Sequence, residues 1–293
     1  MSDEVNYHWG IIMNILFWNT NIPKSGDTKA SNIDSCLLSL VMENDVDLLI
    51  LAEYGEDINY LCRAISNLTG VQYIPIQSTN NCKIKGIVNI KYNIQTLRED
   101  ISSRYLIVKI TTEFYELIVA MIHSDSKLYS RDNRQEEALR WFHYKIIEVQ
   151  EEHQCSNVIA IGDYNVNPFE EACLSASTLF ALPFAEDTIR NPTRKMGDRI
   201  YQKFYNPTWK FLGNREIPYT TYHYYDSRDM TNCYWNAIDQ VMIRPSLIKV
   251  FDDKHFKIIS NTKEHQLLRN KKPDDENYSD HLPLFCILKE ELI

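Results

Sequence analysis

The sequence contains little glycine, and no two glycines lie close together. Among its 293 residues there are only 8 glycines. Neither G-x-G-x-x-G nor G-x-x-x-x-G-K occurs, which excludes a Rossmann dinucleotide site and a Walker phosphate loop. Any phosphate chemistry must therefore use side chains and a metal ion.

The chain also lacks the features of a secreted, membrane-spanning or disulfide-stapled protein. Its 7 cysteines form no C-x-x-C pair, and an odd number leaves one over in any complete pairing, which favours a reducing compartment. The N-terminus has acidic residues where a signal peptide has basic ones, and no run of about eighteen apolar residues occurs. We therefore expect a cytoplasmic protein with no membrane insertion.

An overall positive charge is absent too. The chain has 31 Lys and Arg against 40 Asp and Glu, a net charge of -9. This balance disfavours a surface that attracts nucleic acid everywhere, although a local basic face stays possible. Because 44% of the residues are hydrophobic, the chain can bury a substantial core, and a disordered protein is excluded.

Apolar runs and helical patterns mix along the chain. Strands are expected at residues 13–18, 46–52, 71–76, 86–92, 105–111, 115–123, 157–161, 238–243 and 281–288. Helices are expected from a Ser31 or Asn32 cap to residue 44, at 57–68, at 131–152, and from an Asn167 cap to residue 178. This order lacks strict βαβ alternation, which predicts an α/β fold with mixed or antiparallel sheets in layers. Because no linker or repeat divides the chain, we expect one domain over residues 1–293.

Polar side chains recur where the predicted strands stop. They are Asn19, Asn21, Glu53, His123, Asp163, Asn165, Asp239, Asp280 and His281. Each alone is more commonly a cap or a turn residue. Together they are the groups needed to hydrolyse a phosphate ester with Mg²⁺, because oxygen ligands suit a hard cation and a His–Asp pair orients a general base.

The order of these groups resembles the endonuclease/exonuclease/phosphatase superfamily, which includes deoxyribonuclease I. The pattern W-N-x-N, E, H-S, G-D-Y-N-x-N-P, I-D-x-V and S-D-H-x-P extends over residues 13–289. Its most specific parts are G-D-Y-N at 162–165 and S-D-H-L-P at 279–283. The resemblance implies a four-layer α/β sandwich in which two mixed β-sheets pack face to face between helices. Residues 1–12 would be an N-terminal extension and residues 190–228 a substrate-selecting insertion.

The resemblance implies a site for Mg²⁺ or Mn²⁺. Glu53 would be the principal metal-binding carboxylate, with Asn19 and Asp280 as ligands or as groups that orient ligands. Asn21 stands where some members carry an acid. That difference leaves open whether one or two metal ions bind, and it makes Asn21 a candidate substrate-binding residue.

The resemblance also implies catalytic roles. Asp163 would orient or deprotonate the attacking water, and Asn165 would donate a hydrogen bond to the phosphate. His281 would contact the scissile phosphate while Asp239 holds its tautomer. His123 would contact the phosphate as well; abasic-site endonucleases have a tyrosine near this position, whereas deoxyribonuclease I and the phosphatases have a histidine.

Residues 190–228 carry a local charge of +5 and nine interleaved aromatic rings. Stacking of bases on aromatic rings beside phosphate-contacting cations is a known way to hold nucleic acid. The alternative is that many of these rings only pack a long loop. We expect substrate contacts from Arg199, Lys203, Trp209 and Lys210.

The sequence thus predicts a metal-dependent hydrolase of ester bonds, with nucleic acid as the favoured substrate and cleavage by in-line attack of water. A phosphatase or phosphodiesterase acting on a lipid headgroup, an inositol phosphate or a nucleotide would share every catalytic residue. A catalytically silent binding module is disfavoured because Glu53, Asp163, Asp239 and His281 are all present. Protein partners are not predicted.

Overall fold

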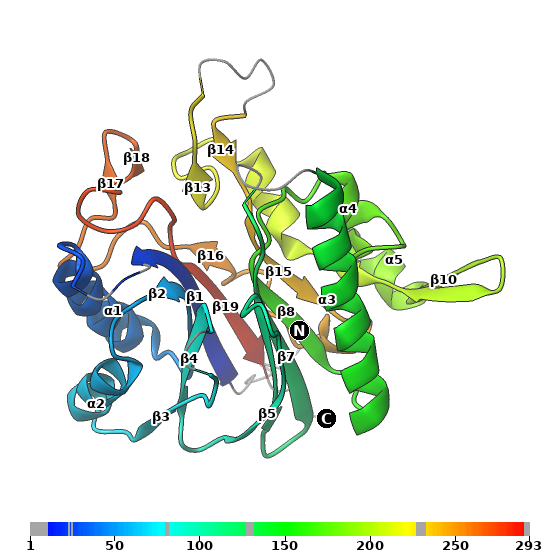
Figure 1. Cartoon of the computed structure of the whole chain (residues 1–293), viewed down its shortest axis with the longest axis horizontal. Coiled ribbons are helices and arrows are strands. Elements are labelled where there is room, and N and C mark those ends of the chain that lie inside the picture. Colours follow the sequence, from blue (N-terminus) through cyan, green and yellow to red (C-terminus); the bar gives the residue numbers. More distant parts are fainter. Residues whose placement is uncertain are drawn as a thin grey trace, which may run out of the picture.

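The computed structural model describes residues 11–22, 24, 26–79, 82–126, 132–226 and 233–289. Most of the expected N-terminal extension therefore lies outside the described residues. Figure 1 shows two large sheets packed face to face, with α1 and α2 covering one outer face and α3 covering the other. This arrangement confirms the predicted four-layer α/β sandwich of mixed sheets.

The first sheet has six strands in the order β16-β19-β1-β2-β4-β3. Their bounds are β1 Ile11–Ile22, β2 Leu48–Tyr54, β3 Tyr73–Pro75, β4 Ile84–Asn89, β16 Lys257–Ile258 and β19 Leu284–Lys289. Two helices cover its outer face, α1 (Ala30–Asn44) and α2 (Ile58–Thr69).

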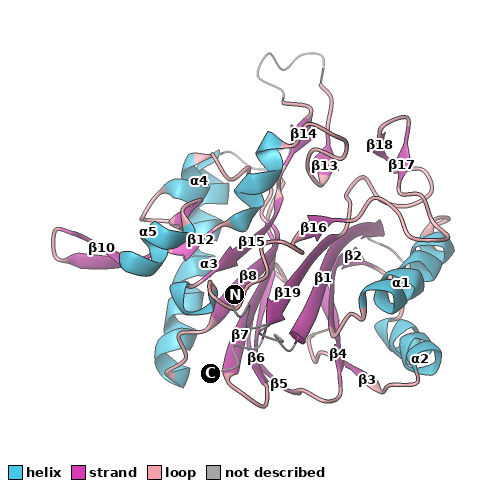
Figure 2. Cartoon of the chain, turned by 180° about the vertical axis from the view of Figure 1, so that it is seen from behind, coloured by secondary structure: helices cyan, strands magenta, loops and turns pink. Residues whose placement is uncertain are grey.

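The second sheet has seven strands in the order β5-β6-β7-β8-β15-β12-β9. Their bounds are β5 Asn93–Glu99, β6 Tyr105–Thr111, β7 Glu116–His123, β8 Val158–Asp163, β9 Ala181–Leu182, β12 Phe204–Tyr205 and β15 Asp239–Ile243. Its outer face is covered by α3 (Asp132–His153), seen beside the sheet in both views (Figure 2).

Shorter elements connect and extend these layers. They are α4 Glu171–Leu174, α5 Ala185–Arg190, the 3-10 helices η1 Pro207–Gly213 and η2 Pro245–Leu247, and the strand pairs β10 Thr193–Met196 with β11 Arg199–Gln202, β13 Tyr222–His223 with β14 Trp235–Asn236, and β17 Leu268–Arg269 with β18 Lys272–Pro273. The expected insertion 190–228 is thus spread over several elements, one of which, β12, belongs to the second sheet.

Side chains alternate between the two faces of each strand, and this alternation explains how the sheets and helices pack in layers. In β1, Met13, Ile15 and Phe17 point into the core between the sheets. The intervening Leu16 and Trp18 pack toward α1 and α2. Successive side chains of a strand point to opposite faces, so a strand covered on both sides reads as one continuous apolar run.

The strand register brings the predicted polar residues to one edge. Parallel pairing of β7 with β8 sets His123 opposite Asp163, and antiparallel pairing of β15 with β8 sets Asp239 opposite Asp163 as well. In the first sheet, β1 runs parallel to β2 and sets Asn19 opposite Ala52. The carboxyl ends of β1, β2, β7 and β8 therefore lie together at the edge where β15 begins.

The predicted cap of the first helix is wrong. Helix α1 begins at Ala30, with Lys29 as its N-cap, so Ser31 and Asn32 lie inside the first turn. The backbone N–H of Lys29 instead donates to Asp27, 3.0 Å away, in the turn that precedes the helix. The expected end at residue 44 is confirmed.

The helix expected from Asn167 to residue 178 is also wrong. Only α4 forms there, and its N-cap is Glu170. The side chain of Asn167 is engaged elsewhere, because its Oδ1 accepts from the backbone N–H of Ala237 and its Nδ2 donates to Asn236. Asn167 thus ties this loop to the segment that leads into β15, and it does not cap a helix.

Candidate active site at the shared edge of the sheets

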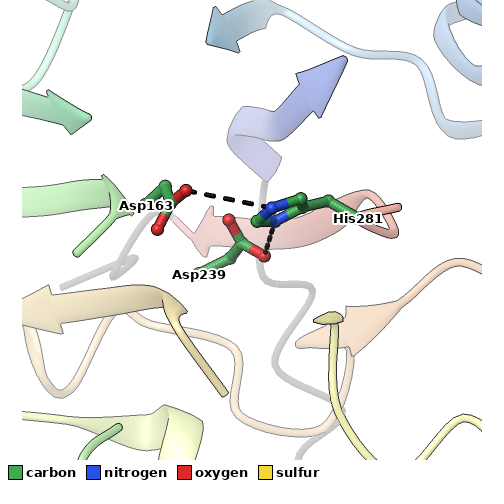
Figure 3. A group of neighbouring side chains, drawn as sticks. All are labelled: Asp163, Asp239 and His281. Carbon is green, nitrogen blue, oxygen red and sulfur yellow. Dashed lines mark hydrogen bonds and ion pairs between the residues drawn. The ribbon is translucent and has the colours of Figure 1, made fainter. Parts of the chain in front are cut away.

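A His–Asp pair lies at the centre of this edge. Nδ1 of His281 is 2.8 Å from Oδ2 of Asp239, and Nε2 of His281 is 4.0 Å from Oδ2 of Asp163 (Figure 3). All three residues are buried. Because the carboxylate of Asp239 only accepts, Nδ1 of His281 is the donor, and Nε2 is left to face Asp163 and a substrate.

The charges of this cluster are strongly coupled. Burial opposes the charged imidazole of His281, but Asp239 beside it outweighs burial and raises the pKa of His281. Burial and the neighbouring Asp239 both raise the pKa of Asp163. Oδ1 of Asp239 is buried without a hydrogen-bond partner among the described residues. The cluster therefore has more acceptors than its own donors satisfy, and it favours positive charge.

An amide network joins the two sheets beside this pair. Nδ2 of Asn19 donates to Asp163 over 3.1 Å. The backbone N–H of Asn21 donates to Oδ1 of Asn19, and Nδ2 of Asn21 donates to Asp280 over 2.9 Å. Ser279 holds the backbone at the first of these residues, because its hydroxyl donates to the main-chain carbonyl of Asn19 over 2.6 Å. The sheet containing β1 is thereby tied to the sheet containing Asp163.

Glu53 lies beside the second histidine. Nε2 of His123 is 3.6 Å from Oε1 of Glu53 and 3.8 Å from Oδ2 of Asp163. Burial, reinforced by the positive charges of Lys83 and Arg104, lowers the pKa of His123 to about 3. This histidine is therefore neutral at physiological pH. It lies between the carboxylate predicted to bind metal and the one predicted to orient water.

Three residues of the cluster have left-handed backbone conformations. Asn21 has φ 49°, Glu53 φ 51° and Asn165 φ 54°. Asparagine tolerates this region, whereas glutamate is uncommon there and costs about 1–2 kcal/mol. Residues held in such conformations cluster at functional sites, where the surrounding structure holds them in place.

Asn165 is held by both neighbouring loops. Its backbone N–H donates to Asp163 over 2.8 Å, and its Nδ2 donates to the carbonyl of Ser124 over 3.0 Å. The buried Gln135 of α3 donates to the carbonyls of Asn165 and Asp125. Gln135 thus ties α3 to both loops.

Tyr222 is a residue of this site that the sequence reasoning did not single out. Its ring centroid lies 4.5 Å from that of His281, and the two backbones form a β-bridge. The indole N–H of Trp18 also donates to the carbonyl of His281 over 2.9 Å. The aromatic run around residue 222 was visible in the sequence, but no spacing marked this tyrosine as the one beside the histidine.

The cations predicted to bind substrate are not brought to the cluster. Strand β12 pairs with β15 at Ile243, the end opposite Asp239. Immediately before β12, the buried Lys203 bonds Asp187 over 3.0 Å. Arg199 is exposed on the β10–β11 hairpin, which projects away from the sheets (Figure 1).

The other two predicted substrate contacts lie on η1. Nζ of Lys210 donates to the carbonyls of Asp253 and Phe256, over 2.6 and 2.5 Å. Trp209 is half-buried, and its Nε1 has no partner among the described residues. This 3-10 helix packs on β15, since the hydroxyl of Thr208 accepts from the backbone N–H of Val241. The polar contacts of Lys210 are therefore made within the fold.

The donor atoms of the edge fit a hard divalent cation. Asp163, Asp239 and His281 offer ligand atoms that lie within 4.8 Å of one another. The half-buried carboxylate of Glu53 is close to this group through His123, and Asp280 through Asn21. Oxygen atoms prevail in this set, as Mg²⁺ and Mn²⁺ require.

No family model and no curated protein matches the sequence. Solved structures match it over nearly its whole length. TDP2 from D. rerio complexed with a single strand DNA product has a TM-score of 0.54 at 15% identity, covering 95% of this chain and 99% of that chain. An endonuclease/exonuclease/phosphatase family protein from Bacteroides thetaiotaomicron has a TM-score of 0.56 at 13% identity, covering 96% and 98%.

A third similar structure is a mannosyl-6-phosphatase from Bacteroides thetaiotaomicron, with a TM-score of 0.55 at 14% identity, covering 94% of this chain and 98% of that chain. At such identities the likeness concerns the fold. It confirms the fold implied by the sequence resemblance, that of the endonuclease/exonuclease/phosphatase proteins. In the described part of the chain, no helix combines the length and the apolar character needed to cross a membrane.

Proposed function

We propose that the chain is a metal-dependent phosphodiesterase that hydrolyses nucleic acid. One observation carries this proposal: the buried Asp163, Asp239 and His281 meet at the edge where Glu53 and His123 also lie. The same groups fit Mg²⁺ or Mn²⁺ and the attack of water on a phosphorus atom. A catalytically silent module would have no need to keep such a costly cluster of buried charges.

Glu53, Asn19 and Asp280 are the residues that would hold the cation. When bound, the ion would polarise the phosphoryl oxygens and neutralise charge that develops on them. The hydrogen bond from Asn21 holds Asp280, and the hydroxyl of Ser279 holds the backbone of Asn19. Both groups would thus be oriented before the ion arrives.

The remaining residues would act on the water and the phosphate. Asp163 is fixed by Asn19 and by the backbone N–H of Asn165, so its carboxylate has a defined direction in which to orient a water molecule. One N–H of the Asn165 amide is used by Ser124. The second stays available to donate to a phosphoryl oxygen. His281, held by Asp239, presents Nε2 as a proton donor or as a positive stabiliser.

Two neighbours of the same fold support different substrates. D. rerio TDP2 is complexed with a single strand DNA product, and another neighbour is a mannosyl-6-phosphatase. A phosphatase or a phosphodiesterase of small molecules or lipid headgroups is therefore the second candidate. The exposed aromatic rings and the arginine in the groove beside the site favour nucleic acid.

The proposal is tested with a panel of substrates and one catalytic variant. Wild-type protein is incubated with labelled DNA and RNA oligonucleotides and with a phosphomonoester, each with Mg²⁺, Mn²⁺ or EDTA. We expect metal-dependent oligonucleotide cleavage, reduced about 100-fold or more in His281→Ala. His255→Ala, which alters an exposed histidine, should cleave at the wild-type rate. Hydrolysis of the monoester alone would transfer the assignment to the second candidate, and no hydrolysis of any substrate would refute both.

A further inference from the structure

A groove lies between α3 and the end of β7. It is next to the edge of the sheets that carries Asp163, Asp239 and His281, which we call the catalytic edge. Its volume is about 590 Å³. The lining includes Arg104, Tyr105 and Ser124 at the adjoining ends of β6 and β7, and Arg134, Trp141 and Tyr144 from α3, together with the carboxylates of Asp100, Asp125 and Glu137. Neither the metal-binding groups nor the His–Asp pair belong to this lining, so the groove is a neighbouring space with its own chemistry.

Ser124 connects the groove to the catalytic cluster. Its backbone N–H donates to the carbonyl of Asp163, and its carbonyl accepts from the side chain of Asn165. The same residue lines the groove, and its hydroxyl oxygen is buried without a hydrogen-bond partner among the described residues. Arg104 is equally close, because its carbonyl accepts from the backbone N–H of His123 over 2.8 Å. The groove therefore lies beside the catalytic cluster on this side, where it could receive a nucleic acid strand.

Aromatic rings stand exposed along the groove. Trp141 is 53% exposed and Tyr144 is 49% exposed, although the opposite side of α3 buries Leu139, Phe142 and Ile146 completely. The two exposed rings stack on each other, with centroids 5.6 Å apart and planes 28° apart. Core packing therefore does not explain them. A stacked, half-exposed pair presents a flat apolar face to a ligand.

Cations accompany these rings. Nζ of Lys145 lies 4.7 Å from the Trp141 ring and 5.5 Å from the Tyr144 ring. Arg134 is exposed about two helical turns before Trp141, toward the catalytic edge. Lys145 also pairs with Glu148 over 2.7 Å, and Arg104 pairs with Asp125. Arg134, beside the exposed rings, is therefore the cation that would contact a phosphate next to a stacked base.

We propose that this groove binds the nucleotide adjacent to the scissile bond, with its base stacked on Trp141 and its phosphate near Arg134. The inference rests on the proposed function and names the substrate as single-stranded nucleic acid. A base must be unpaired to lay its face on a protein ring, and every base has such a face, so the binding is tolerant of sequence.

Binding to a labelled single-stranded oligonucleotide, measured by fluorescence anisotropy in EDTA, tests the groove without any catalysis. Trp141→Ala should raise the Kd at least about fivefold, the loss that one base stack implies. The matched control is Phe114→Ala, which removes an exposed ring from the turn at the opposite end of β7. It should leave the Kd unchanged. DNA and RNA of one sequence are compared, and a loss with either supports the groove.

Turnover of bis(4-nitrophenyl) phosphate with Mg²⁺ separates this inference from the proposed function. This small diester reaches only the catalytic edge, so Trp141→Ala should hydrolyse it at the wild-type rate while its KM for oligonucleotide rises. Wild-type affinity of Trp141→Ala for the oligonucleotide would overturn the groove and leave the proposed function standing. An equal loss on both substrates would also overturn it, because the residue would then be structural. If wild-type protein hydrolyses no phosphodiester, the proposed function itself fails.

Discussion

Glu53 combines a metal-binding side chain with a strained backbone. Its position after the apolar run of β2 was enough to predict a role in the sequence, because strand ends place polar groups at one edge. Its φ of 51° was not predictable. The conformation is held by hydrogen bonds on both sides, since the backbone N–H of Glu53 donates to Lys83 and its carbonyl accepts from the hydroxyl of Thr20. A costly backbone angle kept at a carboxylate agrees with the proposed metal site.

Glu53→Gln should therefore lose metal binding while keeping the fold. The amide is isosteric but uncharged, so hydrolysis should fall about 100-fold or more at limiting Mg²⁺. Mg²⁺ should raise the unfolding temperature of wild-type protein through its binding to the native state, and this rise should be absent in the variant. Glu113→Gln, in the exposed turn before β7, serves as the control. A variant that keeps both the rise and the activity would remove Glu53 from the site.

The His281–Asp239 pair should behave as one catalytic unit. The contact of 2.8 Å fixes both the ring orientation and the tautomer. Asp239→Asn and His281→Ala should each reduce kcat strongly, and the double variant should be little worse than either. Single-turnover rates of the four proteins on one oligonucleotide measure the interaction. If the two losses multiply, the residues act independently and the role assigned to Asp239 is wrong.

At the scale of elements, strands buried on both faces were the easiest to predict. The runs at 46–52 and 157–161 became β2 and β8 with their ends displaced by one or two residues. Strand β5 was missed because its sequence N-I-Q-T-L-R-E is polar and lies at the edge of the sheet. Backbone hydrogen bonds to β6 hold this strand in the sheet, and its sequence lacks the alternation of apolar residues that would predict a strand. The helix predicted after Asn167 is absent for a related reason, since the backbone of the distant Ala237, just before β15, binds that side chain.

The same difference between local sequence pattern and tertiary contacts separates the site residues that were predictable from those that were not. Groups at strand ends were predictable because local pattern fixes where a strand stops. The cations of residues 190–228 were not, because charge composition does not reveal which lysines are used within the fold, as Lys203 is by Asp187. The exposure of Trp141 was not predictable, because this residue belongs to a helix whose apolar stripe explains the core residues around it.

Gly162 makes the approach of β7 to β8 possible beside the site. A Cβ at this position would lie 1.9 Å from the carbonyl oxygen of Ile122. Gly162→Ala must therefore push the two parallel strands apart at Asp163 and His123. We expect a lower unfolding temperature and a large loss of kcat, measured by calorimetry and by oligonucleotide cleavage. Gly70→Ala, at the end of α2 where no atom lies within 4 Å, also meets a left-handed angle and should lower stability without a direct effect on kcat.

A further prediction concerns the molecule as a whole, because a buried cation joins its outer helix to its second sheet. Arg244 follows β15 and is fully enclosed, with its guanidinium 3.8 Å from the Phe204 ring centroid. It donates to Gln150 and His143 of α3, over 3.1 and 3.0 Å, and to the carbonyl of Lys203. A buried charge must keep every such partner. In particular, Nε2 of His143 must stay unprotonated to accept from Arg244.

This requirement makes the stability of the whole protein sensitive to acid. Burial, aided by Arg244, lowers the pKa of His143 to about 3, against an ordinary value of 6.5. Between those two pH values the unfolded chain binds a proton that the native chain refuses, so the free energy of unfolding rises with pH. The stability from neutral His143 is complete above pH 6.5 and is lost as the pH falls toward 3. His123, whose pKa is lowered to about 3, acts in the same direction, whereas Asp163, whose pKa is raised by burial and by Asp239, acts in the opposite direction.

His143→Gln removes the one proton that the unfolded chain binds at this position, so it should weaken the dependence of stability on pH. Urea unfolding measured in EDTA between about pH 4.5 and 6 should give a slope of unfolding free energy against pH that is lower than the wild-type slope by about 1.4 kcal/mol per unit. The variant should also be less stable at neutral pH, since glutamine cannot reproduce both contacts of the ring with Thr178 and Arg244. Equal slopes in His143→Gln and wild type would mean that His143 is protonated alike in both states, and the account of how Arg244 is held would have to change.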